Sequence, residues 1–280
     1  MIDTLLDAII DTLKLLPYLF VAFIILELLE HKLSRKNEIL LRKNRKFGPF
    51  IGGVLGAIPQ CGFSTMGASL YSSRVITIGT VVAIFLSTSD EMLPIMLGEN
   101  VNILVILKII GFKVLIGIIV GLLVDLIYRD KTSKGHDYIH DMCDNEDCHC
   151  ERDGIFLSSI KHTLKVSLVV LLANALINIV IYFVGTDNLT KLLVDKNIIT
   201  YFASGLIGLI PNCASSVLIT KLYLADLISL GALLTGLLAG SGLGILLLFR
   251  NNHNFKENVT ILGIIYFTGL FVGILVDIIK

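Results

Sequence analysis

The chain has 280 residues, of which 55% are hydrophobic and only 16% are charged, and its 23 basic and 23 acidic residues leave no net charge. With a mean hydropathy of +0.84 it has too little polar surface for a soluble domain of this length. We therefore expect an all-α polytopic membrane protein whose surroundings are a lipid bilayer, and no nucleic-acid partner.

Six apolar stretches reach the roughly 20 residues that a helix needs to cross a bilayer. They cover residues 5–29, 75–97, 101–128, 156–183, 227–249 and 259–279. The first is not expected to be a cleaved signal peptide, because its start carries Asp3, Asp7 and Asp11 rather than basic residues. Six full spans are thus predicted.

Two further segments, 47–71 and 200–223, are interrupted at their centres by glycine, proline and amide residues. Pro59 and Pro211 each remove a backbone donor and clash with the preceding turn, so each segment is predicted to form two half-helices. Arms of about 12 residues are too short to cross, which favours a re-entrant hairpin lined by protein or a water-filled cavity. A single kinked crossing is the alternative.

The chain also contains an internal repeat. A shift of 152 residues aligns 56–128 with 208–280 without a gap, and 22 of the 73 aligned pairs are identical. We predict a first membrane repeat at 1–128, a polar loop at 129–155 and a second repeat at 156–280, each repeat with three spans and one broken hairpin.

Basic residues in the short loop after the first span predict the orientation. They are Lys32, Arg35, Lys36, Arg42, Lys43, Arg45 and Lys46. By the positive-inside rule the loop 31–46 is cytoplasmic, the N-terminus is outside and the loop 129–155 is cytoplasmic. Three crossings in the first half then invert the second, whereas a crossing by 47–71 would make the halves parallel.

The centres of the two broken segments carry the same kinds of polar side chain. The first has Gln60, Cys61 and Ser64, and the second has Asn212, Cys213, Ser215 and Ser216. A half-helix beginning after the proline directs free N–H groups at a ligand, while unwound carbonyls and side-chain oxygens accept a cation. We predict a substrate-binding role, with kinked helix contacts around buried cysteines as the alternative.

A carboxylate pair interrupts the stretch 75–97. Ser87, Ser89, Asp90 and Glu91 are the candidate substrate-binding residues there, with Asp90 preferred. Carboxylates at membrane depth are costly and mark cation or proton paths, although both acids could instead reach the interface. The matching positions 239–243 carry no charge, so the predicted site is asymmetric. Lys108 and Lys113 could neutralise a carboxylate but neither is assigned a role, and Asp125 and Asp277 are expected to be structural.

The loop 129–155 has a metal-binding composition. Its candidate metal ligands are His136, His140, Cys143, Cys148, His149 and Cys150, interleaved with six acidic residues. The spacing is not that of a standard zinc finger, so the metal and its geometry stay open. A solvated acidic loop with incidental Cys and His residues is the alternative.

With these motifs the sequence resembles the bacterial family of ten-segment heavy-metal exporters, which is related to arsenical permeases and often labelled as manganese transporters. The resemblance rests on the residues 56–64, 85–91 and 211–214 and on the loop ending at Cys150. It implies export of a metal or metalloid across the bacterial plasma membrane, and six spans plus two two-armed hairpins make ten segments. Manganese prefers oxygen ligands, whereas two membrane cysteines suit softer ions or arsenicals, so the substrate stays open.

These features predict a secondary transporter and not an enzyme. The sequence has no phosphate-binding Gly-x-x-x-x-Gly-Lys-Ser/Thr loop, so an ion gradient, with protons as the coupling ion, is expected to supply the energy. We expect no required cofactor; the ions expected on the protein are the transported metal and a metal on the 136–150 loop. The oligomeric state is open. The alternatives are a thiol–disulfide electron carrier using Cys61 and Cys213, and an anion carrier or channel.

Overall fold

The computed structural model describes residues 47–57, 61–72, 74–88, 92–128, 198–211 and 213–279, with isolated positions in 16–24 and 160–172. All regular structure within these ranges is helical, which confirms the all-α prediction. The loop 129–155 and nearly all of the predicted spans 5–29 and 156–183 lie outside the described residues.

The described helices form two matching series of five. The first is α3 (Gly48–Gly56), α4 (Cys61–Ser72), α5 (Ile78–Ser87), α6 (Met92–Gly98) and α7 (Ile103–Ile127). The second is α11 (Ile198–Gly208), α12 (Cys213–Leu224), α13 (Leu230–Ala239), α14 (Leu243–Asn251) and α15 (Phe255–Ile279). Adding 152 to the bounds of α4, α5 and α7 gives those of α12, α13 and α15. Even the left-handed turn residue recurs, as Arg74 in one copy and Asp226 in the other.

Among the described residues, four stretches are long and apolar enough to cross a membrane, which confirms four of the predicted spans. They are Ile78–Gly98, Ile103–Ile127, Leu230–Asn251 and Phe255–Ile279. The first and third differ from the prediction in one respect, because each consists of two helices separated by a short break. The sequence predicts an interruption near Asp90 in the first of these spans. In the third it predicts one uninterrupted span at 227–249.

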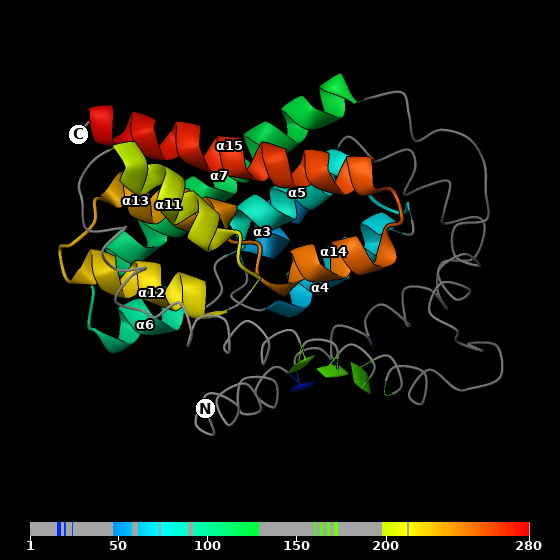
Figure 1. Cartoon of the computed structure of the whole chain (residues 1–280), viewed down its shortest axis with the longest axis horizontal. Helices are drawn as coiled ribbons and strands as arrows, with labels where there is room; N and C mark the ends of the chain where they lie inside the picture. Colours follow the sequence, from blue (N-terminus) through cyan, green and yellow to red (C-terminus); the bar gives the residue numbers. More distant parts are fainter. Residues whose placement is uncertain are drawn as a thin grey trace.

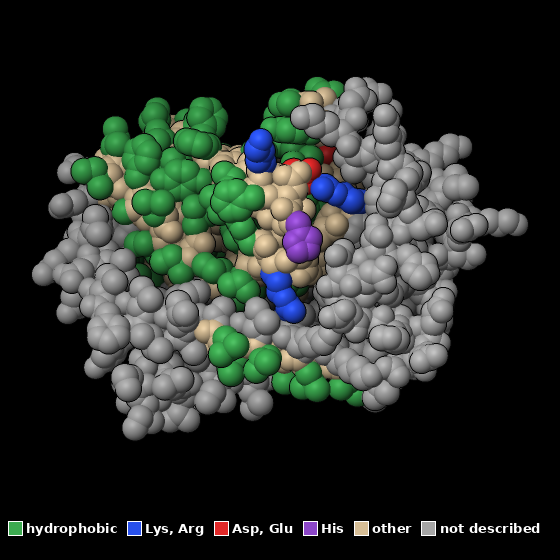
Figure 2. All heavy atoms as spheres, turned by 45° about the vertical axis from the view of Figure 1, so that its right-hand side comes forward, with side chains coloured by type: hydrophobic (Ala, Val, Ile, Leu, Met, Phe, Trp, Pro, Cys, Tyr) green, Lys and Arg blue, Asp and Glu red, His purple; other side chains and the backbone are tan. Residues whose placement is uncertain are grey.

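The two broken spans are central and the two long helices are peripheral. Inside the protein lie 67% of the apolar window of Ile78–Gly98 and 78% of that of Leu230–Asn251, against 22% for α7 and 33% for α15. Large apolar side chains of α7 and α15, such as Leu126 and Phe271, stay exposed. Figure 2 shows hydrophobic side chains over much of the described surface, as expected where lipid replaces water.

Small residues bring α5 and α7 into close antiparallel contact. A Cβ atom on Gly79 would lie 2.1 Å from the Gly121 carbonyl oxygen, and one on Gly117 would lie 2.9 Å from the Ala83 carbonyl oxygen. Both distances are too short for any larger residue, so the glycines allow the helix backbones to approach. The second repeat has the same contacts between α13 and α15, at Gly231 and Gly273 and at Gly269 and Thr235.

An aspartate near the end of each long helix fastens the start of the broken span. Asp125 accepts hydrogen bonds from the Gly79 N–H at 2.8 Å and the Thr77 hydroxyl at 2.7 Å. Asp277 accepts them from the Gly231 N–H at 3.0 Å and the Tyr201 hydroxyl at 2.7 Å. The bonds from Gly79 and Gly231 satisfy N–H groups that the first turn of a helix leaves free, in agreement with the structural role expected for both aspartates.

The two repeats also interlock. Helix α4 of the first packs on α14 of the second, α12 of the second packs on α6 of the first, and α5 meets α13 between them. Figure 1 shows these pairs side by side, with α4 beside α14 and α6 below α12. In the same view the matching helices α7 and α15 run in opposite directions across the molecule.

Candidate functional site

Each repeat contains a break after a proline, as the sequence predicts. Helix α4 begins at Cys61, two residues after Pro59, and α12 begins at Cys213, two residues after Pro211. In Figure 1 the chain runs along α11 in one direction and returns along α12, as the arms of a hairpin do. The first turn of any helix has N–H groups without a partner in the helix itself, so both prolines precede a turn that can receive other acceptors.

Each repeat has a second break, at the end of its central helix. Thr88 leaves α5 with an extended backbone (φ −55°, ψ 129°), and its hydroxyl donates to the Ile84 carbonyl at 2.7 Å. Gly240 leaves α13 with ψ 94°, and Gly242 adopts φ 54°, a left-handed conformation that favours glycine. Thr88, next to the first of these breaks, and Ser241, within the second, are buried, so the backbone there is broken inside the protein.

Close contacts between small residues bring the breaks near one another. A Cβ atom on Gly56, at the end of α3, would lie 2.2 Å from the hydroxyl oxygen of Ser87, at the end of α5. One on Gly244, at the start of α14, would lie 2.9 Å from the Cβ of Ser64 in the first turns of α4. In the second repeat the Cβ of a substituted Gly208 would meet the Gly236 carbonyl oxygen at 2.2 Å. The region of these contacts contains helix ends from both repeats.

A fully buried lysine reaches this region. The side chain of Lys113 on α7 has 0% exposure, and its ammonium donates to the carbonyl of Thr88 and, at 2.9 Å, to that of Leu237. The first acceptor is at the end of α5, and the second lies in the last turn of α13. A lysine at the centre of a transmembrane helix costs about 2.5–3.5 kcal/mol, so it is retained only where polar partners receive it.

The structure buries three of the predicted site hydroxyls. Ser64 and Ser87 are fully buried, and Ser87 donates to the Ala83 carbonyl at 2.8 Å and the Ile84 carbonyl at 3.0 Å. Ser215 is also buried, and its hydroxyl donates back across the proline break to the Ile210 carbonyl at 3.3 Å. Ser216 is half-buried. Ser87 lies against the end of α3, and Ser64 lies against the start of α14.

The remaining predicted site residues lie outside the described part of the chain. They are Gln60, Ser89, Asp90, Glu91 and Asn212, the side chains of Cys61 and Cys213, and the loop ligands His136, His140, Cys143, Cys148, His149 and Cys150. Among the described residues no group of three or more His, Cys, Asp or Glu side chains could hold a metal ion.

Lys113 is not among the predicted site residues, although the residue spacing along α7 contains a pattern that indicates its position. Lys113, Gly117 and Gly121 are spaced by four residues, so they share one face of α7. Because Gly121 and Gly117 pack along α5, the next position on that face lies at the end of α5. The small-residue spacing predicts which of the two lysines faces inward, whereas apolarity does not.

Ser241 is not among the predicted site residues either, because the segment 239–243 carries no charge. Its side chain is fully buried in the break between α13 and α14, and its hydroxyl has no hydrogen-bond partner within the described ranges. A buried hydroxyl without a partner costs about 1–3 kcal/mol. Its match in the first repeat is Ser89, so both copies have a serine at this point of the break.

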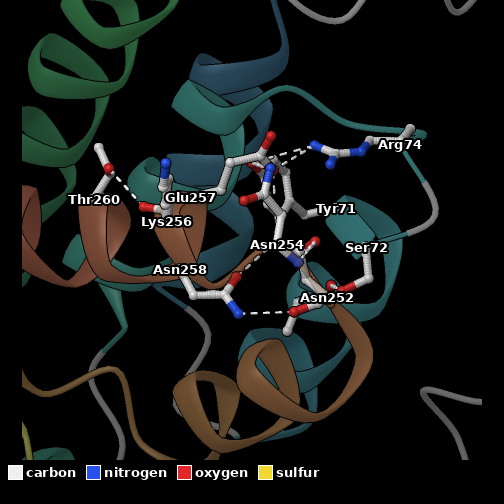
Figure 3. A network of polar contacts seen from close by, with 10 residues as sticks. Tyr71, Ser72, Arg74, Asn252, Asn254, Lys256, Glu257, Asn258 and Thr260 are labelled. Carbon is white, nitrogen blue, oxygen red and sulfur yellow. Dashed lines mark hydrogen bonds and ion pairs between the residues drawn. The ribbon is translucent and has the colours of Figure 1, made fainter.

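A separate polar network joins the repeats where α4 ends and α14 turns into α15 (Figure 3). Glu257 accepts from the Arg74 guanidinium at 2.7 Å, the Tyr71 hydroxyl at 3.0 Å and the Asn252 amide at 3.5 Å. Burial alone lowers the pKa of Arg74, but the Glu257 carboxylate raises it above its ordinary value, so the guanidinium stays charged. The network lies away from the helix breaks.

Residues 1–186 match the family described as “Putative, 10TM heavy-metal exporter”. These residues include the whole first series of described helices and are about two thirds of the chain. No curated protein and no solved structure matches the chain.

Proposed function

Since the chain belongs to the family of 10TM heavy-metal exporters and is a multi-pass membrane protein, we propose that it is a secondary exporter whose substrate passes through the region enclosed by the helix breaks. The substrate is a heavy-metal or metalloid ion.

One observation carries the proposal: breaks in buried helices of both repeats lie in contact. Gly56 brings the end of α3 to Ser87, and Gly244 brings the start of α14 to Ser64. Broken backbone survives at membrane depth only where protein or a water-filled cavity satisfies it. Paired breaks between repeats are the arrangement in which secondary transporters place their substrate.

The donor atoms at these breaks suit a cation. Ser64, Ser87 and Ser215 supply buried hydroxyls, Ser241 supplies a buried hydroxyl with no partner among the described residues, and carbonyls end α5 and α13. In the sequence, Gln60, Cys61, Asn212 and Cys213 follow the prolines, Ser89, Asp90 and Glu91 follow Thr88, and Ser216 follows Ser215. Oxygen donors favour manganese and similar ions, and thiolates favour softer ions or trivalent arsenic.

Asp90 is the proposed coupling residue. It follows Thr88, an acceptor of Lys113, by two positions in the sequence. A carboxylate that binds a metal on one side and a proton on the other exchanges the two across the membrane, so an inward proton gradient drives export. Glu91 is the second candidate.

The proposed topology is inverted, with the N-terminus outside and the loops 31–46 and 129–155 in the cytoplasm of a bacterial cell. Two observations support it: the basic residues of 31–46 and the opposite directions of α7 and α15 in Figure 1. In this arrangement His136, His140, Cys143, Cys148, His149 and Cys150 capture metal in the cytoplasm, where thiols stay reduced.

A metal panel tests the proposal. Cells with and without the protein are loaded with manganese, zinc, cadmium, iron or arsenite, and the retained metal is measured over time. The protein is expected to speed the loss of at least one of them. Equal retention of all five with and without a protein that is correctly inserted in the membrane would refute metal export.

A further inference from the structure

Lys113 is the described charged residue with the deepest burial, and it occurs in one repeat only. Its match in the second repeat is Ile265, which is also fully buried. The fold therefore accepts an aliphatic side chain at this place. A charge that packing does not need is expected to serve the transported ion.

The position of Lys113 follows from the packing of α7 on α5. Gly121 lies against Gly79, and Gly117 lies one turn further along, against Ala83. One more turn brings Lys113 to Thr88, where α5 ends and its last carbonyls lack helical partners. The second acceptor, Leu237, belongs to α13 in the other repeat.

Two helix ends thus face one ammonium. The C-terminal end of a helix carries about half a negative charge, so two ends together match about one positive charge. Carbonyl oxygens at such ends are also the groups that coordinate cations in broken-helix transporters. The carbonyls of Thr88 and Leu237 are therefore suited to bind a cation, and the Lys113 ammonium occupies this cation site in the structure.

We propose that Lys113 competes with the transported metal cation for one binding site. Its ammonium occupies the cation site between the ends of α5 and α13 until the metal displaces it. This inference rests on the proposed function. In the metal-free state the lysine neutralises the partial negative charge of the cation site and excludes other cations. It returns to the site when the metal leaves. Metal release is thereby helped by a charge that belongs to the chain.

Metal binding to the purified full-length protein tests this competition. Lys113→Ile copies the residue of the second repeat, and Lys108→Gln on the exposed side of α7 is the matched control. With Mn²⁺ and Cd²⁺ as probes, Lys113→Ile is expected to bind about tenfold more tightly than the wild type, because the metal no longer displaces a charge-assisted hydrogen bond. Lys108→Gln is expected to bind as the wild type does.

Unchanged or weaker binding of Mn²⁺ and Cd²⁺ by a folded Lys113→Ile variant would overturn the proposal. If the wild type binds and transports none of the metals, the proposed function itself fails.

A second measurement needs no variant. Reductive methylation of wild-type protein, read by mass spectrometry, reports how accessible each lysine is. Saturating metal is expected to raise the labelling of Lys113 and to leave that of Lys108 unchanged. Labelling of Lys113 that stays the same or falls with metal contradicts displacement.

Discussion

The ammonium of Lys113 donates a hydrogen bond of 2.9 Å to the carbonyl of Leu237, although the two residues lie 124 positions apart and in different repeats. This bond crosses the boundary between the copies at the place where both central helices end. It makes the interior asymmetric, because the matching Ile265 carries no charge.

The aspartate contacts predict equal stability losses in the two repeats. Asp125→Asn weakens two charge-assisted hydrogen bonds to the start of α5, and Asp277→Asn weakens one to the start of α13 and one to Tyr201 on α11. Each variant is expected to lose about 1.5–3 kcal/mol of unfolding free energy. Thermal unfolding in detergent measures this, and Asp226→Asn, in an exposed turn, is expected to unfold at the wild-type temperature.

The close helix contacts predict that Gly79→Ala and Gly231→Ala are severely destabilised. Their Cβ atoms would lie 2.1 Å and 2.2 Å from backbone carbonyl oxygens, and backbone cannot move aside cheaply. Such overpacking costs about 1–3 kcal/mol or more. Gly111→Ala and Gly263→Ala are matched controls, since nothing lies within 4 Å of their Cβ positions. Comparable unfolding temperatures for all four variants would argue against this packing.

The network of Figure 3 predicts an unequal effect of its two charges. Glu257 accepts from three side chains, whereas Arg74 contributes one of those bonds, so Glu257→Gln is expected to lower the unfolding temperature more than Arg74→Gln. Both side chains are about 30% exposed, so the ion pair alone is worth less than about 1 kcal/mol. The double variant should resemble Glu257→Gln, and Lys256→Gln serves as the exposed control.

The loop 129–155 is predicted to bind metal without being part of the transport path. Replacing Cys143, Cys148 and Cys150 by serine removes its three thiols and is expected to lower the metal bound per protein in equilibrium dialysis. Flux through proteoliposomes at saturating metal should persist. Complete loss of flux in a correctly folded variant would assign the loop a part of the transport path.

Much of the fold could be predicted from the sequence, because the repeat and the prolines act locally. Pro59 and Pro211 determine where α4 and α12 begin, and the 152-residue shift carries helix bounds from one copy to the other. The break at Gly240 was missed, since glycine and serine within an apolar run also occur in unbroken membrane helices.

The inward face of α7 could not be assigned from apolarity, because lipid and protein interior are equally apolar. Lys108 and Lys113 are five residues apart in one helix, and only the glycine contacts with α5 separate the exposed lysine from the buried one. Likewise, the contacts of the buried hydroxyls depend on how the helices of one repeat pack on those of the other. This packing places Ser64 against Gly244, although 180 positions separate them in the sequence.

The most direct test of metal export through this site is flux of the responding metal into proteoliposomes that contain wild-type protein or Asp90→Asn. Both proteins are reconstituted to the same level, and Asp226→Asn serves as the control for loss of an exposed acid. The wild type and the control are expected to transport the metal when a proton gradient is applied, and Asp90→Asn is expected to transport none. Wild-type flux by Asp90→Asn would contradict the account.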